Sequence, residues 1–174
     1  TYQVGDYAQG GIVFYVDETG KHGLVAALED LTEGATDPWG RGFNGYEWGC
    51  YGESINGADG EAIGTGYQNT MDIVNQGCAT EGGGVTAAQA ALDAEINGYS
   101  DWYIPSKDEL LEIYSTIGQG GPEGNIGGFE NSDPYYLSSS ELNLYSAWLV
   151  AFSNGYTDYH LKLNPGRVRV IRAF

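Results

Sequence analysis

The sequence predicts an α+β fold, from its composition and from two kinds of hydrophobic periodicity. Aliphatic residues are scarce, whereas 28 Gly, 14 Tyr and 4 Trp occur among 174 residues, a balance typical of turn-rich β structure rather than of a helical bundle. Short segments with helical spacing interrupt the β-rich runs. Because the length suits one domain with its own core, we expect residues 1–174 to form a single unit. Short helices would pack on a small, mostly antiparallel, twisted sheet with long ordered loops.

The N-terminal part predicts a hairpin followed by a long loop region. Residues Gly11 to Leu28 contain two β-rich runs around the polar stretch Asp17 to Gly23, which is typical of a hairpin. From Glu29 to Gly66, glycines, Asn-Gly steps and isolated aromatic residues follow one another without a sustained period. We expect an ordered loop region held by aromatic anchors and by Cys50.

The middle of the chain predicts three helices and one short strand. Tyr67 to Val74 and Thr86 to Ile96 have helix-compatible spacing, and the first residue of the second segment is a suitable N-cap. Asp101 to Pro105 is expected to form a brief strand. Ser106 and Glu109 then form a capping-box pattern before an amphipathic helix, which gives both residues a structural role.

The C-terminal third predicts a loop and then only strands. The glycine- and acid-rich stretch Gly118 to Pro134 has no period and should be an exposed loop anchored by Phe129. Turn residues separate the β-rich runs that follow. These runs are Tyr135 to Glu141, Ala147 to Ser153, Tyr156 to Leu163 and Arg167 to Phe174.

The charge balance excludes some partners. With 24 Asp and Glu against 7 Lys and Arg, the net charge is −17, so the chain repels nucleic acid and anionic membrane surfaces. No apolar run is long enough to insert this segment into a membrane. Clustered carboxylates suit calcium, which makes it the candidate cofactor, but acidity also serves solubility. No particular metal ligands are indicated.

The two cysteines, Cys50 and Cys78, favour a disulfide. They are too far apart for a redox CxxC motif and lack the further ligands of a structural zinc site. A disulfide closing this loop would contribute roughly 3 to 4 kcal/mol and would place the protein in an oxidising compartment outside the cytoplasm. The alternative is a pair of reduced, buried thiols.

The sequence predicts a binding protein rather than an enzyme. Motifs of serine hydrolases, zinc proteases and nucleotide-binding loops are absent. His22 falls in the hairpin turn and His160 in a strand, and neither has a nucleophile motif beside it. Asp108 and Glu109 are adjacent on one helix turn and cannot flank a glycosidic bond. A glycan hydrolase would need a cleft with two carboxylates of different pKa.

The strands of the tail carry more apolar residues than one core face requires. In Ala147 to Phe152, Trp148, Val150 and Phe152 supply one apolar face, yet Leu149 and Ala151 make the opposite face apolar too. One interpretation is a sheet covered on both sides. The other is an exposed patch of an interaction surface.

The same excess recurs in the neighbouring segments. In Tyr156 to Leu163, apolar Tyr159, Leu161 and Leu163 alternate with polar Asp158, His160 and Lys162. Leu142, Leu144 and Tyr145 occupy a turn, where polar residues are expected.

Several segments, taken in order, resemble one bacterial family. They are GGIVFYVDETGKHGLVAA near the start, WGC at Trp48 to Cys50, ADGEAIGTGYQNT, NGYSDWYIPSKDEL, YYLSSSE and the terminal RVRVIRAF. The chain is similar over almost its whole length to the DUF1566 or Lcl C-terminal-type domain. That resemblance implies a C-type-lectin-like fold. It also implies a place in surface proteins, lipoproteins or adhesins that bind sugars or proteins.

The tail is also similar to the variable region of proteins diversified by diversity-generating retroelements, in which scrambled positions alternate with fixed scaffold residues. This resemblance implies a scaffold of Ser138 to Glu141, Ala147, Trp148, Phe152, Asn154, Gly155, Lys162 and Arg167 to Phe174. It implies that the ligand-binding residues are Leu142, Leu144, Tyr145, Leu149, Ala151, Tyr156, Asp158, Tyr159, His160, Leu161 and Leu163. Most of these residues are the ones that depart from the strand pattern.

One departure limits the expected ligands. Sugar-binding lectins of this fold hold calcium and sugar hydroxyls through an EPN- or QPD-like triplet and a WND strand, and this sequence has neither. We therefore expect an extracytoplasmic module whose partner is a protein or glycan on another cell or surface. The alternatives are a self-assembling subunit of a surface fibre or virion, whose partner is a second copy, and a plain glycan-binding lectin-like domain.

Overall fold

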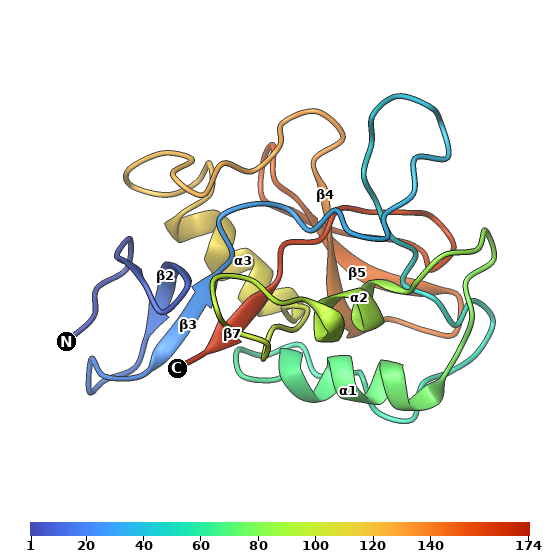
Figure 1. The fold of residues 1–174 in the computed structure, drawn as a ribbon, viewed down its shortest axis with the longest axis horizontal. Coiled ribbons are helices and arrows are strands. Elements are labelled where there is room, and N and C mark those ends of the chain that lie inside the picture. The colour runs from blue at the N-terminus through green and yellow to red at the C-terminus, as the bar shows by residue number, and fades with distance from the viewer.

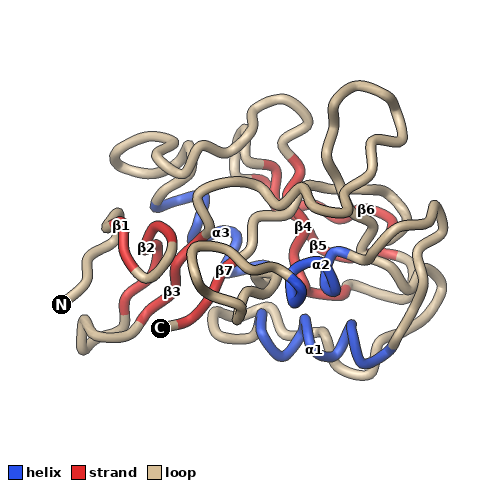
Figure 2. Tube along the Cα trace, viewed as in Figure 1, coloured by secondary structure: helices blue, strands red, loops and turns tan.

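A computed structural model describes all residues from 1 to 174 and has three short helices and two small antiparallel sheets (Figure 1). The predicted α+β class is confirmed. The strands form two sheets, of four and three strands, rather than the one small sheet that was expected. In Figure 2, the strands β1, β2, β3 and β7 lie on one side of the molecule and β4, β5 and β6 on the other.

The first sheet joins the two ends of the chain. Its strands, in spatial order, are β1 (Tyr7–Ala8), β2 (Gly11–Val16), β3 (Gly23–Ala26) and β7 (Ile171–Ala173). Strands β2 and β3 are the predicted hairpin, and Leu24 of β3 lies opposite Ala173 of β7. Both termini therefore lie at the same end of the molecule (Figure 1).

The helices α1 (Gly66–Gln76), α2 (Ala87–Asp93) and α3 (Lys107–Thr116) occupy the predicted segments. Thr86 caps α2 by accepting a hydrogen bond from the Gln89 N–H. The helix ends at Asp93, before the predicted Ile96, because Ala94 is already extended and buried.

The predicted capping box opens α3. The Ser106 N–H donates to Glu109 Oε1 at 2.7 Å, and the Glu109 N–H donates to Ser106 Oγ at 3.3 Å. Leu110 and Ile113 of α3 are buried in one cluster with Phe14 of β2 and with Phe152. The helix thus packs against strands of both sheets.

The predicted strand Asp101 to Pro105 does not form, apart from one bridge between Tyr103 and Ile171. Its backbone groups bond elsewhere. The Ile104 N–H donates to Thr70 Oγ1 at 3.1 Å, and the Pro105 carbonyl accepts from the Ser139 N–H at 2.8 Å. Proline also lacks the N–H that a ladder needs.

The second sheet consists of β4 (Tyr135–Glu141), β5 (Ser146–Ala151) and β6 (Tyr156–Leu161), with β5 in the centre. The fourth predicted run, Arg167 to Phe174, divides its bonding between the sheets. The Leu137 N–H of β4 donates to the Arg167 carbonyl, whereas only Ile171–Ala173 form β7 of the first sheet.

The long loop regions are anchored as the sequence predicts. Residues 29–66 contain no named strand or helix before α1 begins. A disulfide between Cys50 and Cys78, with the Cα atoms 4.8 Å apart, ties this region to the end of α1. Phe129 is buried against Phe152, with 4.5 Å between the ring centroids. None of the helices is long and apolar enough to cross a membrane.

Candidate functional site

The terminal segment is a buried scaffold held by arginines. Arg169 donates to Asp30 Oδ1 at 2.9 Å and to the Gly127 carbonyl, so it links two loops. Arg172 donates to Asp101 Oδ1 at 2.7 Å. The apolar residues that separate Arg167, Arg169 and Arg172 are fully buried: Val168, Val170 and Ile171. Most of this segment is therefore closed to solvent, although Ala173 is exposed.

Lys162 belongs to the same scaffold, although it directly follows the exposed strand β6. It is 1% exposed, and its Nζ lies 2.8 Å from Glu141 Oε2 and 2.9 Å from the Glu53 carbonyl oxygen. The ammonium also lies over the Trp48 ring, 4.9 Å from its centroid. The pair therefore joins β4 to the long loop region.

The turn between β5 and β6 has a fixed shape. Gly155 has a φ of 77°, and an added Cβ would overlap the ring of Tyr114 on α3. Asn154 Oδ1 accepts a hydrogen bond from the Tyr156 N–H at 3.0 Å. The two turn residues thus have structural tasks, which agrees with their predicted scaffold role.

The central strand β5 is covered on both faces. Val150 lies in the cluster beneath α3, while Leu149 lies in a different cluster with Val168. Leu149 is 1% exposed and Ala151 is 7% exposed. The prediction that these two residues face outward is therefore wrong. A central strand with a helix on one face and the 166–170 segment on the other buries both sets of side chains.

The strand β6 is the opposite case, because it is the free edge of the second sheet. Tyr156, Tyr159 and Leu161 are 72%, 54% and 42% exposed, Asp158 is exposed, and His160 is half-buried. All five are predicted ligand-binding residues. The structure brings them together on one strand and leaves them open to solvent.

The side chains of β6 cover both faces of the sheet edge. Tyr159 lies opposite Trp148 of β5, and their ring centroids are 6.0 Å apart in an edge-to-face arrangement. Lys107 Nζ at the start of α3 lies 4.9 Å from the Trp148 centroid. On the other face, His160 packs against Tyr135 of β4 at 5.1 Å.

We call these residues the edge surface. Its members are Tyr135, Trp148, Tyr156, Asp158, Tyr159, His160 and Leu161. Tyr135 was not among the predicted ligand-binding residues, and Trp148 was predicted to belong to the scaffold. Trp148 is placed there by the strand register, in which it lies opposite Tyr159, and Tyr135 by its ring contact with His160. The periodicity of a single strand does not reveal such contacts between strands.

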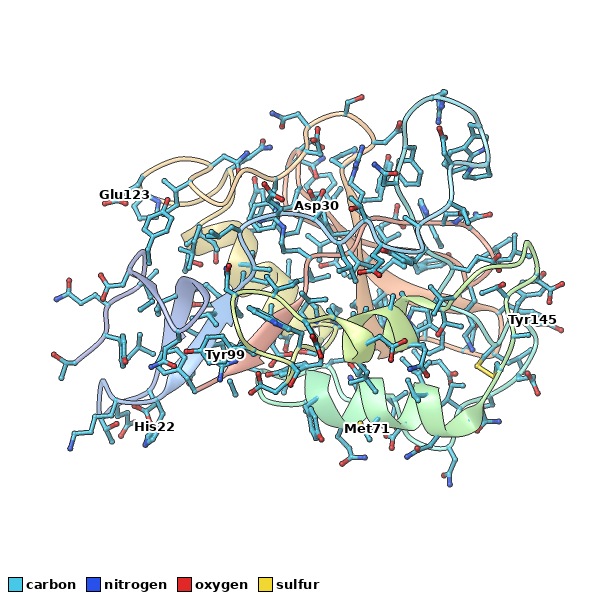
Figure 3. All side chains as sticks on the ribbon, viewed as in Figure 1. His22, Asp30, Met71, Tyr99, Glu123 and Tyr145 are labelled. Atoms are coloured by element: carbon cyan, nitrogen blue, oxygen red, sulfur yellow. A yellow bond between two sulfur atoms is a disulfide. The ribbon has the colours of Figure 1, made fainter.

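The remaining predicted residues lie at the ends of the strands. Leu142, Leu144 and Tyr145 are exposed in the β4–β5 turn, and Tyr145 packs on Tyr51 with the centroids 5.4 Å apart. Figure 3 shows Tyr145 at the end of the molecule opposite His22. Leu163 is half-buried beyond β6 and lines a shallow hollow that holds no other predicted residue.

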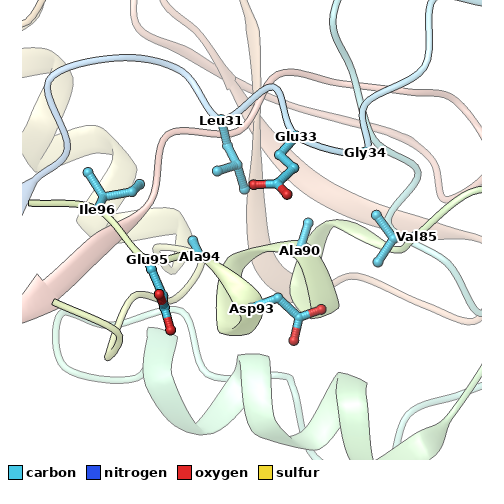
Figure 4. Close-up of a pocket in the computed structure, with 9 residues that line it drawn as sticks. All are labelled: Leu31, Glu33, Gly34, Val85, Ala90, Asp93, Ala94, Glu95 and Ile96. Atoms are coloured by element: carbon cyan, nitrogen blue, oxygen red, sulfur yellow. The ribbon is translucent and has the colours of Figure 1, made fainter. Parts of the chain in front are cut away.

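A small hollow beside α2 lies outside the edge surface. It has a volume of about 210 Å³ and is lined by apolar residues such as Leu31 and Ala90, with the carboxyl groups of Glu33, Asp93 and Glu95 (Figure 4). None of the predicted ligand-binding residues contributes to it.

The buried acid Glu109 serves the fold. Burial raises the pKa of its carboxyl group, and its two oxygens accept hydrogen bonds from the N–H groups of Ser106 and Gly64. One cluster of metal-ligating residue types occurs, in which the side-chain ligand atoms lie within 4.8 Å of one another: Cys50, Glu53 and Cys78. The two sulfur atoms of that group form the disulfide, so they are not thiolate ligands. This group does not match the oxygen-rich site that calcium requires.

The fold and the edge surface together define a small disulfide-linked α+β domain with an open, aromatic edge strand. The sequence model of the Lcl C-terminal domain, DUF1566, matches residues 56–172. Because the match covers more than half of the chain, the protein belongs to this family. None of the curated proteins matches the chain.

Proposed function

We propose that this protein is an extracytoplasmic binding module whose edge surface contacts a protein or glycan, without catalysing a reaction. One observation carries the proposal: β6 exposes large aromatic and apolar side chains, while Lys162 and the neighbouring residues Leu149 and Val150 of β5 are buried. Exposed residues of this kind gather at interaction sites. The disulfide supports a location in an oxidising compartment.

The chemistry of the edge surface suits binding. Tyrosine offers a large, rigid and amphipathic contact at a small cost in conformational entropy. Asp158 and His160 flank Tyr159 on β6 and add hydrogen-bonding groups. The net charge of −17 favours neutral or cationic partner surfaces over phosphate-rich ones.

We further propose that the tail is diversified by a retroelement. This is supported by the contrast between buried scaffold residues such as Lys162 and exposed slots such as Tyr156. Substitutions at exposed sites away from packing and hydrogen bonds usually change stability by less than about 0.5 kcal/mol. Sequencing of the flanking DNA tests the idea. A near-copy of the tail's coding sequence that differs only at adenines, beside a reverse transcriptase, is expected; no such copy would contradict it.

The binding role is tested with glycan and peptide arrays. We expect the double variant Tyr156→Ala/Tyr159→Ala to lose at least about tenfold in affinity for the array ligands of the wild type, since aromatic anchors dominate interfaces. Tyr7→Ala is the matched control, because Tyr7 is 69% exposed on β1 of the other sheet. Unchanged binding by the folded double variant would overturn the proposal.

A further inference from the structure

The outer edge of β6 has unused backbone hydrogen-bonding groups. The Lys162 N–H donates to the Tyr145 carbonyl across the sheet. Bonding alternates along an antiparallel pair, so the N–H groups of Thr157, Tyr159 and Leu161 point away from β5. The N–H groups of Thr157 and Leu161 bond to no other protein group.

Two outward groups are covered by local contacts, of which one is the Leu161 carbonyl, which accepts a hydrogen bond from the Asn164 N–H at 2.9 Å. The Tyr159 N–H donates to Oδ1 of its neighbour Asp158 at 2.8 Å. The carboxylate thus caps the centre of the free edge in the single chain. Open strand edges are sites where another chain adds a strand.

We propose that two copies of this protein associate by antiparallel pairing of their β6 strands, with the twofold axis at Tyr159. This goes beyond the ligand-binding role and does not depend on it. The register follows from the side chains. With the axis at Tyr159, Asp158 of each copy lies opposite His160 of the other, in the close pairs that are not backbone-bonded. Thr157 lies opposite Leu161.

The neighbouring registers are less favourable. An axis at residue 158 places the two Asp158 carboxylates opposite each other, and like charges at that position are destabilising. An axis at residue 160 places imidazole against imidazole and sets Asp158 opposite the buried Lys162. In the favoured register the Tyr159 N–H donates to the Tyr159 carbonyl of the second copy instead of to Asp158. The Asp158 carboxylate is then free to contact the His160 imidazole of the second copy.

The pairing forms one continuous six-stranded sheet from two three-stranded sheets. The side chains of β6 project from the faces of the sheet, so the edge surfaces of both copies remain accessible beside each other. The net charge of −17 on each copy opposes association. Added salt screens this repulsion, so we expect it to strengthen pairing, whereas it would weaken binding of a cationic ligand.

Sedimentation over a range of protein concentrations measures the pairing. We expect His160→Asp, which sets carboxylate against carboxylate, and Asp158→His, which sets imidazole against imidazole, each to weaken the dimer at least about tenfold. The exchanged variant D158H/H160D restores both opposed pairs and should recover wild-type association. An equal mixture of the two single variants should form a mixed dimer.

A backbone variant tests the edge itself. Thr157→Pro removes an outward N–H that has no partner in the single chain, a position where an edge strand tolerates proline. We expect a folded monomer by circular dichroism and sedimentation. A wild-type chain that is monomeric at about 1 mM, or a dimer unaffected by Thr157→Pro and by His160→Asp, would overturn the inference. Array binding by monomeric Thr157→Pro reports separately on the proposed function.

Discussion

At the scale of single residues, Lys162 marks the boundary between scaffold and surface in the tail. Its strand neighbours His160 and Leu161 are at least partly exposed, yet its own side chain is buried and paired with Glu141. Alternation within Tyr156 to Leu163 groups Lys162 with the polar, outward residues. The resemblance to retroelement-diversified tails assigned it to the scaffold, and the structure buries it and pairs it with Glu141.

The Lys162→Met variant is expected to lose about 3 to 5 kcal/mol of unfolding free energy, because it leaves the Glu141 carboxylate buried without its cation. Urea unfolding measures the loss. The control is Lys21→Met, which changes an exposed lysine in the hairpin turn and should cost less than about 0.5 kcal/mol. Equal stability of the two variants would show that the ion pair contributes nothing.

At the scale of elements, the sequence predicted those features that depend on hydrogen bonds between residues close together in the chain. The hairpin, the Thr86 cap and the Ser106 capping box need only a few neighbouring residues, and all three are confirmed. The prediction of a strand at Asp101 to Pro105 was wrong, because the backbone there bonds to the Thr70 side chain and to Ser139, which are far away in the sequence. Leu149 was misplaced for a related reason, since the segment that covers β5 lies elsewhere in the sequence.

The β5–β6 turn offers an element-scale test with a matched pair of glycines. Gly155 and Gly124 both have a φ of 77°, but only an alanine at 155 would meet the Tyr114 ring. We expect Gly124→Ala to cost about 1 to 2 kcal/mol for its left-handed backbone, and Gly155→Ala to cost clearly more in thermal unfolding. If the two variants have the same midpoint, the contact with Tyr114 does not constrain the turn.

At the scale of the whole molecule, the periodicity of the sequence could not predict the division of the strands into two sheets. It could not predict the composition of the edge surface either. The tail was predicted as consecutive strands, and the chain places three of them in one sheet and the last in the other. Trp148 joins the edge surface because the strand register places it opposite Tyr159, and Tyr135 joins it through its ring contact with His160. Seven of the predicted ligand-binding residues are exposed; they came from the resemblance to retroelement-diversified tails, and several of them also depart from the pattern of a buried core.

The disulfide between Cys50 and Cys78 links the long loop region before α1 to the end of that helix. Replacing both cysteines, in Cys50→Ser/Cys78→Ser, is expected to cost about 3.5 kcal/mol, because the bond closes a loop with a sequence separation of 28. Urea unfolding with and without reductant measures this. Reductant should lower the wild-type midpoint and leave the variant unchanged; a wild type insensitive to full reduction would contradict the prediction.

The pairing of β3 with β7 has a consequence for how the chain is made. Leu24 meets Ala173, so one side of β3 has no strand partner until residues 171–173 have been synthesised. The hairpin can form early, whereas the first sheet closes only after β7 has been made, and contacts so distant in sequence form slowly. Nascent chains that stop short of Ile171 would carry an open edge, and quality-control proteases would meet them in that state.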